Sequence, residues 1–166
     1  MKSKKLSFLG LFLTAALILS YIETLIPFFY GIPGLKLGLA NAMVMLLLYI
    51  YGVKDCILVN IIRILIVGFF FGNAFSIIYS LVGALFSVII MVILKKTDKF
   101  DLAVVSICGG MAHNTGQILI ASVFFGTPYL LYYLPVLLLS GFICGGVIGI
   151  ISKGLVTRLK VLLTNG

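Results

Sequence analysis

The chain has 166 residues, of which 63% are hydrophobic and 10% charged, and its formal net charge is +8. A soluble domain carries roughly 25% charged residues to cover its surface, so this composition excludes a water-soluble globule and indicates an integral membrane protein. The three cysteines, Cys56, Cys108 and Cys144, are too widely spaced to indicate a disulfide framework or a zinc site.

Six apolar segments follow one another along the chain, separated by short stretches that contain Gly, Pro or charged residues. They are unbroken rather than alternating, which favours α-helices, because a helix satisfies its own backbone groups within lipid. The first segment has the basic flank of a secretory signal peptide, but it is long enough to span and we interpret it as a retained helix. The expected spans are residues 6–26, 37–51, 54–70, 73–94, 102–125 and 129–156.

The fold class that we expect is an all-α integral membrane protein, with residues 1–166 forming a single bundle of six transmembrane helices. The second and third segments are short for a full crossing, which needs about 20 residues. An alternative therefore joins them into a hairpin that does not cross completely.

The distribution of positive charge predicts the orientation of the chain. Six spans place both termini, the turn at 51–55 and the loop at 95–101 on one side, and ten of the 12 basic residues lie there. The other side has only Lys36, and Arg63 lies within a span. We therefore expect both termini to be cytoplasmic, in the plasma membrane of a bacterial-type cell. The net charge then reflects topology and contact with anionic lipid rather than nucleic-acid binding.

A polar stretch, AHNTGQ at residues 112–117, interrupts the apolar fifth segment. Its members His113, Asn114 and Gln117 are three or four residues apart and share one helix face. A lone intramembrane histidine often only bridges two helices. Three polar side chains on one face, however, have more hydrogen-bonding capacity than one neighbouring helix usually satisfies, so this face is a candidate wall of a ligand pocket.

Arg63 lies near the middle of the third segment, where an arginine costs roughly 2.5–3.5 kcal/mol on insertion scales and has to face protein or water. It is either a structural staple between helices or a residue that also contacts a ligand. Glu23 is the only acidic residue in the membrane or the outer loops, so it is the expected counter-ion. Asn41 either lines the same site or caps a helix start, the role expected of Asn73. The candidate substrate-binding residues are Glu23, Asn41, Arg63, His113, Asn114 and Gln117.

Small residues recur at a spacing of four, which lets helices approach closely. Gly141, Gly145 and Gly149 do so in the sixth segment, and Ser80 and Ala84 in the fourth. We expect most of these positions to pack inside the bundle. The first segment is the candidate for an external docking face, because basic residues flank it. Its small residues are Gly10, Thr14, Ala16 and Ser20.

Signatures of catalysis are absent from the sequence. It has no GxxxxGK[ST] phosphate-binding loop, and Asp55, Asp98 and Asp101 do not form the aspartate-rich motifs on which prenyl-transferring synthases rely. A single histidine is a weak basis for a metal site. We expect no catalytic residue, no metal and no cofactor, and no catalysis by this chain alone.

Four stretches in order resemble the Gx transporter family: PGLKLGLANAMVMLLLY (33–49), GNAFSIIYSLVGALFSVIIM (72–91), AHNTGQ (112–117) and YLPVLLLSGFICG (133–145). Members of that family are also labelled heptaprenyl diphosphate synthase component I. The family is in turn similar to the S-components of energy-coupling factor (ECF) transporters. That resemblance implies a six-helix membrane protein that captures a small molecule at the outer face and docks on a coupling subunit driven by two ATPases. S-components carry Ala-x-x-x-Ala on the first helix, and this chain departs from that with Ala16-x-x-x-Ser20.

The other label implies a non-catalytic membrane subunit of a heptaprenyl diphosphate synthase, or another accessory protein of isoprenoid or quinone synthesis. An autonomous carrier usually has internal repeats, and no repeat is evident between residues 1–83 and 84–166. The expected substrate is a small anionic or heterocyclic compound. The loop FFYGIPGLK (28–36) is a candidate lid, and Tyr129 and Tyr132 either stack on a ring or belong to an interfacial aromatic belt.

Overall fold

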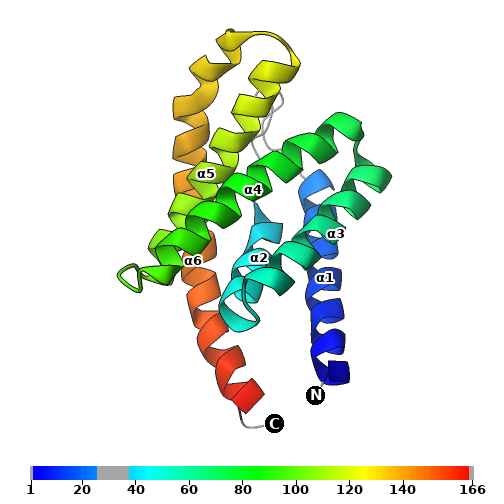
Figure 1. The fold of residues 1–166 in the computed structure, drawn as a ribbon, viewed down its shortest axis with the longest axis vertical. Helices are drawn as coiled ribbons and strands as arrows, with labels where there is room; N and C mark the ends of the chain where they lie inside the picture. The colour runs from blue at the N-terminus through cyan, green and yellow to red at the C-terminus, as the bar shows by residue number, and fades with distance from the viewer. Residues whose placement is uncertain (1, 26–37, 165–166) are drawn as a thin grey trace.

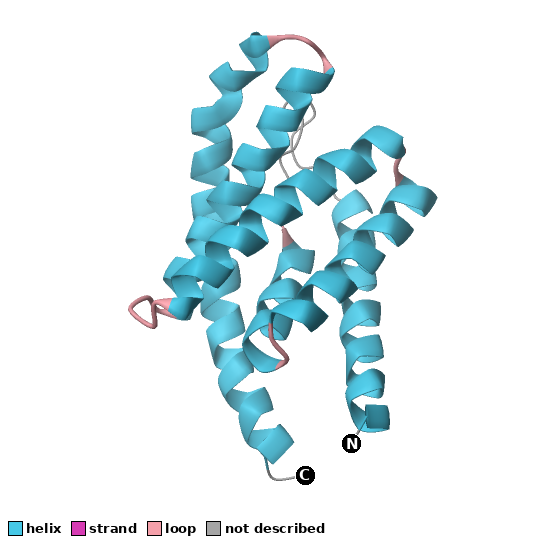
Figure 2. Cartoon of the chain, viewed as in Figure 1, coloured by secondary structure: helices cyan, strands magenta, loops and turns pink. Residues whose placement is uncertain are grey.

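The computed structural model describes residues 2–25 and 38–164. This part of the chain consists of six α-helices and one short 3-10 helix and contains no strand (Figure 2), so the all-α prediction is confirmed. The elements are α1 (Lys2–Leu25), α2 (Leu39–Ile50), α3 (Val53–Phe71), α4 (Ala74–Lys96), α5 (Leu102–Phe124), η1 (Pro128–Tyr133) and α6 (Leu134–Thr164).

Three stretches of the described chain are long and apolar enough to cross a membrane, namely Ser3–Leu25, Ala74–Lys96 and Pro128–Leu159. Polar groups interrupt the other two long helices, Arg63 in α3 and residues 112–117 in α5. The remaining helix, α2, has 12 residues, which is about 18 Å of helix against roughly 30 Å of hydrocarbon core. The six-span bundle therefore stays a prediction.

The short helix α2 lies at the centre of the bundle, against α1, α3 and α6. Its residues 44–48 are each at most 4% exposed, and five successive buried residues cover every side of a helix. Glycines with positive φ flank it, Gly38 at 71° and Gly52 at 96°, a backbone conformation that favours Gly. A helix covered on all sides by protein need not match the thickness of the bilayer.

The segments predicted to be cytoplasmic meet at one end of the molecule. Both described chain ends lie there (Figure 1). An ion pair of 2.7 Å between Lys5 Nζ and Asp55 Oδ2 joins the start of α1 to the start of α3, and Lys95 of α4 donates a hydrogen bond to the carbonyl of Leu48 near the end of α2. We call this the basic end, and the opposite end, formed by the α3–α4 turn and η1, the far end. The basic end carries Lys4, Lys5, Lys54, Lys95 and Lys96.

Glycines bring α6 into close contact with α5. A Cβ atom at Gly141, Gly145 or Gly149 would come within 2.9, 2.8 and 2.7 Å, respectively, of backbone atoms of α5. Contacts shorter than 3.0 Å essentially do not occur for real Cβ atoms, so these positions require glycine at the observed distance between the helices. The internal packing role predicted for these three residues is confirmed.

An apolar core fills the basic end of the bundle. It includes Phe12 of α1, Leu47 of α2, Cys56 of α3 and Val105 of α5, all at most 6% exposed. The thiol of Cys56 donates to the carbonyl oxygen of Val44 at 3.4 Å. Helices from both halves of the chain therefore meet in one apolar contact at this end.

The last predicted span, residues 129–156, agrees with the apolar stretch Pro128–Leu159, but its first turns are not α-helical. Residues 128–133 form the 3-10 helix η1, and α6 begins only at Leu134 and continues to Thr164. Pro135 lacks the N–H that an α-helix would donate to residue 131, so a continuous α-helix from residue 129 is interrupted there. The chain uses a tighter 3-10 turn before the helix begins.

Candidate ligand-binding cavity

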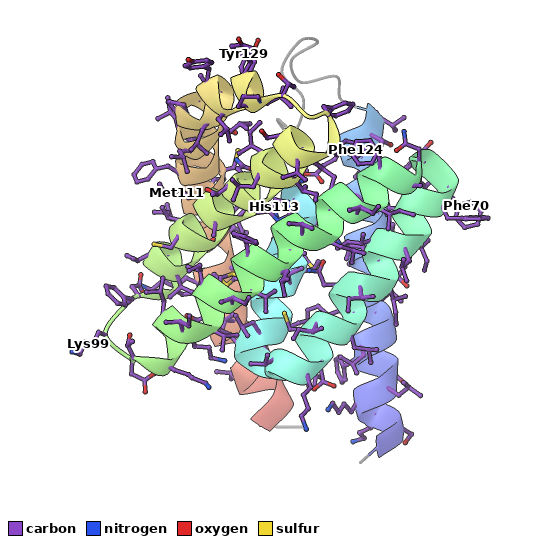
Figure 3. The ribbon with its side chains drawn as sticks, turned by 45° about the horizontal axis from the view of Figure 1, so that its top comes forward. Phe70, Lys99, Met111, His113, Phe124 and Tyr129 are labelled. Atoms are coloured by element: carbon purple, nitrogen blue, oxygen red, sulfur yellow. The ribbon has the colours of Figure 1, made fainter. Side chains whose placement is uncertain are left out.

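All six α-helices contribute to one interior cavity of about 190 Å³. It lies between the apolar core at the basic end and the far end, and exposed residues such as Thr24, Phe71 and Gly72 line it where it reaches the surface. Figure 3 shows His113 in the middle of the bundle, well away from Tyr129 at the far end. The six residues predicted to form a site, Glu23, Asn41, Arg63, His113, Asn114 and Gln117, all line this cavity.

Arg63 is held at the cavity wall by neutral oxygen atoms. Its Nε and one terminal nitrogen donate to Asn60 Oδ1 at 3.2 and 2.8 Å, and the other terminal nitrogen donates to Ser20 Oγ at 3.2 Å. A guanidinium has five N–H donors, so two of them remain without a hydrogen bond among the described residues. The arginine is thus oriented by two helices, α1 and α3, and keeps donor capacity at the cavity.

Glu23 forms no ion pair with Arg63 within 4.0 Å in the described structure, so a direct contact between the two charges is absent there, and its role as a more distant counter-ion stays a prediction. Its carboxylate instead accepts a hydrogen bond of 2.6 Å from the backbone N–H of Leu39. That N–H is the first of α2, where unpaired donors and the helix dipole favour a negative charge. Glu23 therefore fastens the start of the central helix while its charge acts on Arg63 over a longer distance.

The α5 residues of the cavity wall have different roles. The Nδ2 of Asn114 donates to the carbonyl oxygen of Leu137 at 2.7 Å and ties α5 to α6. Gln117 is only 3% exposed, and its amide has no hydrogen-bond partner among the described residues. Gly83 of α4 leaves room for this wall, because a Cβ there would lie 2.7 Å from Gln117 Cγ and 3.0 Å from the ring of His113.

Asn41 and Asn73 fall into separate roles. Asn73 is the N-cap of α4 and forms a capping box with Ser76, as predicted: Ser76 N donates to Asn73 Oδ1 at 2.8 Å and Asn73 N donates to Ser76 Oγ at 2.9 Å. The residue at the N-cap of α2 is Gly38, not Asn41. Asn41 lies in the first turn of α2, with its side chain at the cavity.

Sequence reasoning missed several hydroxyl and amide groups of the cavity wall. From the sequence, Ser80 was interpreted only as a small residue whose spacing allows close packing of helices, although it lines the cavity. Their spacing in the sequence could have predicted that some of these residues line the same site. Ser80 and Ser87 are seven residues apart on α4, which places them two turns apart on the same side of the helix. The further lining residues with hydroxyl or amide side chains are Ser20, Thr24, Asn60, Ser76, Ser80, Ser87 and Ser106.

The proposed docking face on α1 is only partly exposed. Ala16 and Ser20 are 1% and 4% exposed, because they face α2, α3 and the cavity, so this half of the prediction is wrong. Gly10 and Thr14 are exposed, and a Cβ at Gly10 would meet nothing within 4 Å. Only these two positions stay available to a partner.

The two tyrosines of η1 named as candidate ring-stacking residues do not line the cavity. Tyr129 and Tyr132 stack at 6.3 Å between ring centroids and are 72% and 80% exposed. This arrangement fits an interfacial belt rather than stacking on a bound ring. The candidate lid at 28–36 lies outside the described residues.

The lining of the cavity combines polar side chains with apolar ones. No group of three His, Cys, Asp or Glu residues able to hold a metal ion occurs among residues 2–25 and 38–164. The volume of about 190 Å³ is close to the roughly 150 Å³ of a protein cavity that binds benzene. Apolar side chains, among them Val44, Ile64 and Met91, line it beside the polar ones.

Comparison with known proteins gives one match. The family model described as heptaprenyl diphosphate synthase component I matches residues 12–155, well over half of the chain. Neither the curated proteins nor the solved structures provide a significant match. The family label drawn from the sequence is thereby confirmed, and likeness to ECF S-components stays a prediction.

Proposed function

The chain belongs to the heptaprenyl diphosphate synthase component I family, and we propose that it is a non-catalytic membrane subunit that binds a small anionic molecule in its interior cavity. The observation that carries this proposal is the state of Arg63. Its guanidinium lines the cavity, is oriented by Asn60 and Ser20, and retains N–H donors that no described residue accepts. The family description names one component of a synthase, which fits a subunit that carries no chemistry of its own.

The energetics of a buried cation support an anionic ligand. Keeping a charged side chain away from water costs several kcal/mol unless it is paired. Hydrogen bonds to neutral oxygens offset part of that cost. A carboxylate or phosphate offsets more, because its opposite charge adds Coulomb attraction and its oxygens match the bidentate geometry of the guanidinium. Binding an anion at Arg63 would therefore add a direct charge pair, which Glu23 does not form because its charge acts on Arg63 from a longer distance.

The size of the cavity limits the ligand. A volume of about 190 Å³ accommodates a molecule built around one ring, whereas a heptaprenyl chain has several times the volume of one ring. If the ligand is an isoprenoid precursor, only its head group fits inside, and the chain would lie in the lipid.

One form of this function is a substrate-binding subunit of an uptake transporter, similar to an ECF S-component, and the position of the cavity supports it. In the orientation predicted from positive charge, the basic end is cytoplasmic, and the apolar core there seals the cavity from the cytoplasm. The cavity then opens toward the outside of a bacterial-type plasma membrane. The proposed partners are a coupling membrane subunit with its ATPases, and Gly10 and Thr14 remain candidate contacts.

The second candidate is a non-catalytic subunit of a heptaprenyl diphosphate synthase, which the family description favours. In that case the partner is a soluble catalytic subunit at the basic end, where Lys4, Lys54 and Lys96 would meet an acidic surface. The cavity would then hold a head group or a regulatory molecule.

One experiment tests the ligand. Wild-type chain and the Arg63→Gln variant are purified in mild detergent, and small molecules extracted from each are compared by mass spectrometry. We expect at least one anionic compound to co-purify with wild type and to be lost from Arg63→Gln. Arg158→Gln is the matched control, because Arg158 is exposed on α6. An extract in which Arg63→Gln retains every compound of wild type would refute the anion site.

A second experiment separates the two forms of the function. Affinity purification from the native membrane, with identification of co-purifying proteins, is expected to yield a coupling membrane subunit and paired ATPases. Recovery of a soluble polyprenyl synthase instead would favour the second candidate and exclude the transport form.

A further inference from the structure

Serine hydroxyls that face the cavity differ from other hydroxyls on the helices. Thr14, Thr115 and Thr157 donate to the carbonyl four residues earlier at 2.9–3.0 Å, the usual behaviour of a helical hydroxyl. Ser87 of α4 and Ser106 of α5 make no hydrogen bond with any described residue. The hydroxyl groups of these two serines are thus not hydrogen-bonded to the backbone of their own helices and can bond to a molecule in the cavity.

These two serines are buried within the bundle but line the cavity. Ser87 is 7% exposed and Ser106 is 5% exposed, and both line the cavity. Other hydroxyls, those of Tyr79 and Ser152, are enclosed without a partner and do not line it. Because buried polar groups nearly always have a hydrogen-bond partner, the two cavity serines require water or a ligand.

Ser87 and Ser106 lie where α4 packs against α5, closer to the basic end than His113 and Gln117. A Cβ at Gly109 would be 3.3 Å from Ser87 Oγ, and Gly109 is one turn from Ser106 on α5. Ser106 is seven residues from His113 toward the basic end, which corresponds to about 10 Å along a helix. Ser87 and Ser106 therefore form a floor, separate from the polar level of His113 and Gln117, and we call this pair the serine floor.

We propose that the serine floor is a second hydrogen-bonding subsite, so that the ligand is a compact molecule with an anionic group at one end and a hydroxyl or similar polar group at the other. The inference rests on the proposed function, in which Arg63 takes the anionic group. The apolar side chains of the lining, which include Val44 and Val88, would contact the body of the molecule. A ligand with an apolar far end leaves both serine hydroxyls unpaired and binds more weakly.

The test uses two probes of defined chemistry. Benzoate carries one anionic group on a ring of suitable size, and 4-hydroxybenzoate adds a hydroxyl at the opposite end. Dissociation constants are measured by ligand-observed NMR titration for the purified full chain in detergent. The variants are Ser87→Ala/Ser106→Ala, Arg63→Gln, and Ser7→Ala as a control, because the Ser7 hydroxyl is exposed and bonded to its own helix.

We expect wild type and Ser7→Ala to bind 4-hydroxybenzoate about three- to tenfold more tightly than benzoate, the effect of one or two net hydrogen bonds. The double serine variant is expected to bind both probes with the affinity that wild type has for benzoate. Arg63→Gln is expected to lose both probes.

The outcomes separate this inference from the proposed function. Equal affinities in wild type, or a preference that survives in the double serine variant, overturn the serine floor while leaving the anion site intact if Arg63→Gln still abolishes binding. Absence of binding of either probe to wild type overturns the ligand class stated here, and the extraction experiment then decides the proposed function independently.

A measurement of thermal stability tests whether the two serine hydroxyls instead stabilise the fold. Because neither hydroxyl has a partner in the described chain, the melting temperature of Ser87→Ala/Ser106→Ala without ligand is expected to equal or exceed that of wild type. A marked fall would show that the hydroxyls serve packing or bound water within the fold, and would overturn the subsite.

Discussion

The same helices form two unlike regions, the apolar core at the basic end and the polar cavity above it. In the core, Leu47, Cys56 and Val105 have no exposed surface. At the cavity, Arg63, Gln117, Ser87 and Ser106 retain hydrogen-bonding groups that no described residue uses. In the core the helices pack against one another with little exposed surface, whereas at the cavity polar groups are left without hydrogen-bond partners in the described chain. Under the proposed function, stability and binding would depend on different depths of one bundle.

The two regions also differ in what a substitution should do. Removing atoms from the core leaves an empty space and lost contacts, whereas removing a hydroxyl from the cavity wall removes no contact within the protein. The following changes test that division, beginning with the largest expected effect.

Leu47→Ala should be the most damaging single change. Leu47 is completely buried in the core, and truncating a buried leucine costs about 2–5 kcal/mol because the cavity left behind does not fully close. Thermal unfolding in detergent measures the loss. Leu11→Ala is the matched control, because Leu11 is 65% exposed on α1 and its truncation should change the melting temperature little. Similar losses for both variants would contradict the assignment of the core.

Gly145→Ala should destabilise the packing of α6 against α5. The added Cβ would lie 2.8 Å from the backbone of Ile107, and overpacking of this kind costs about 1–3 kcal/mol. The control is Gly10→Ala, where the new Cβ meets nothing within 4 Å and the better helix propensity of alanine applies. The melting temperature should fall for the first variant and be unchanged or higher for the second.

Asn114→Ala should have a moderate effect on stability, because it removes the hydrogen bond of 2.7 Å to the Leu137 carbonyl. A typical net value for such a bond is about 0.5–1.5 kcal/mol. Thr115→Ala next to it removes a bond within α5 only and should cost less. If the two variants unfold at the same temperature, the bond does not hold α5 to α6.

The smallest effect is expected at the exposed ion pair between Asp101 and Lys153. The hydrogen bond of 3.0 Å from Lys153, with backbone donors of Leu102 and Ala103, holds the pKa of Asp101 below its ordinary value of 3.8. A lowered pKa in the folded state adds stability above the unfolded pKa, and that stability is lost as the pH falls through the folded pKa.

Wild type should therefore melt slightly above Asp101→Asn at neutral pH, and the two should converge as the pH falls below 3.8. The difference should be small because solvent screens the pair. Asp98→Asn serves as the control, since Asp98 forms no ion pair within 4.0 Å in the described part of the chain. A difference that persists unchanged at acidic pH would exclude a contribution from the Asp101 charge.

The sequence was sufficient to predict the helices and the convergence of the polar residues. Apolar runs bounded by Gly, Pro and charges predicted α5 to begin at residue 102, where it does begin. Polar residues that cannot face lipid have to face one another or water, which is why His113 and Arg63 line one cavity although they are 50 residues apart.

The sequence could not predict which atoms satisfy these residues. Charge alone made Glu23 the partner of Arg63, but Glu23 is closer to the start of α2, a position set by how the helices pack. The rotation of α1 about its axis was equally hidden, because both of its faces are apolar, and this is why Ala16 and Ser20 were assigned to the wrong side. The serines were overlooked because a helical hydroxyl can bond to its own backbone, and only the structure shows which ones do not.

The position of α2 has a consequence for how the protein is made. With 12 residues and no side open to lipid, this helix is too short to remain across a bilayer as a lone segment. It should therefore leave the insertion machinery together with α3, as a hairpin closed at Gly52. In nascent chains arrested shortly after residue 50, the end of α2 should not remain stably on either side of the membrane. Chains arrested after residue 71 should be integrated. Glycosylation mapping of truncated chains can distinguish these outcomes.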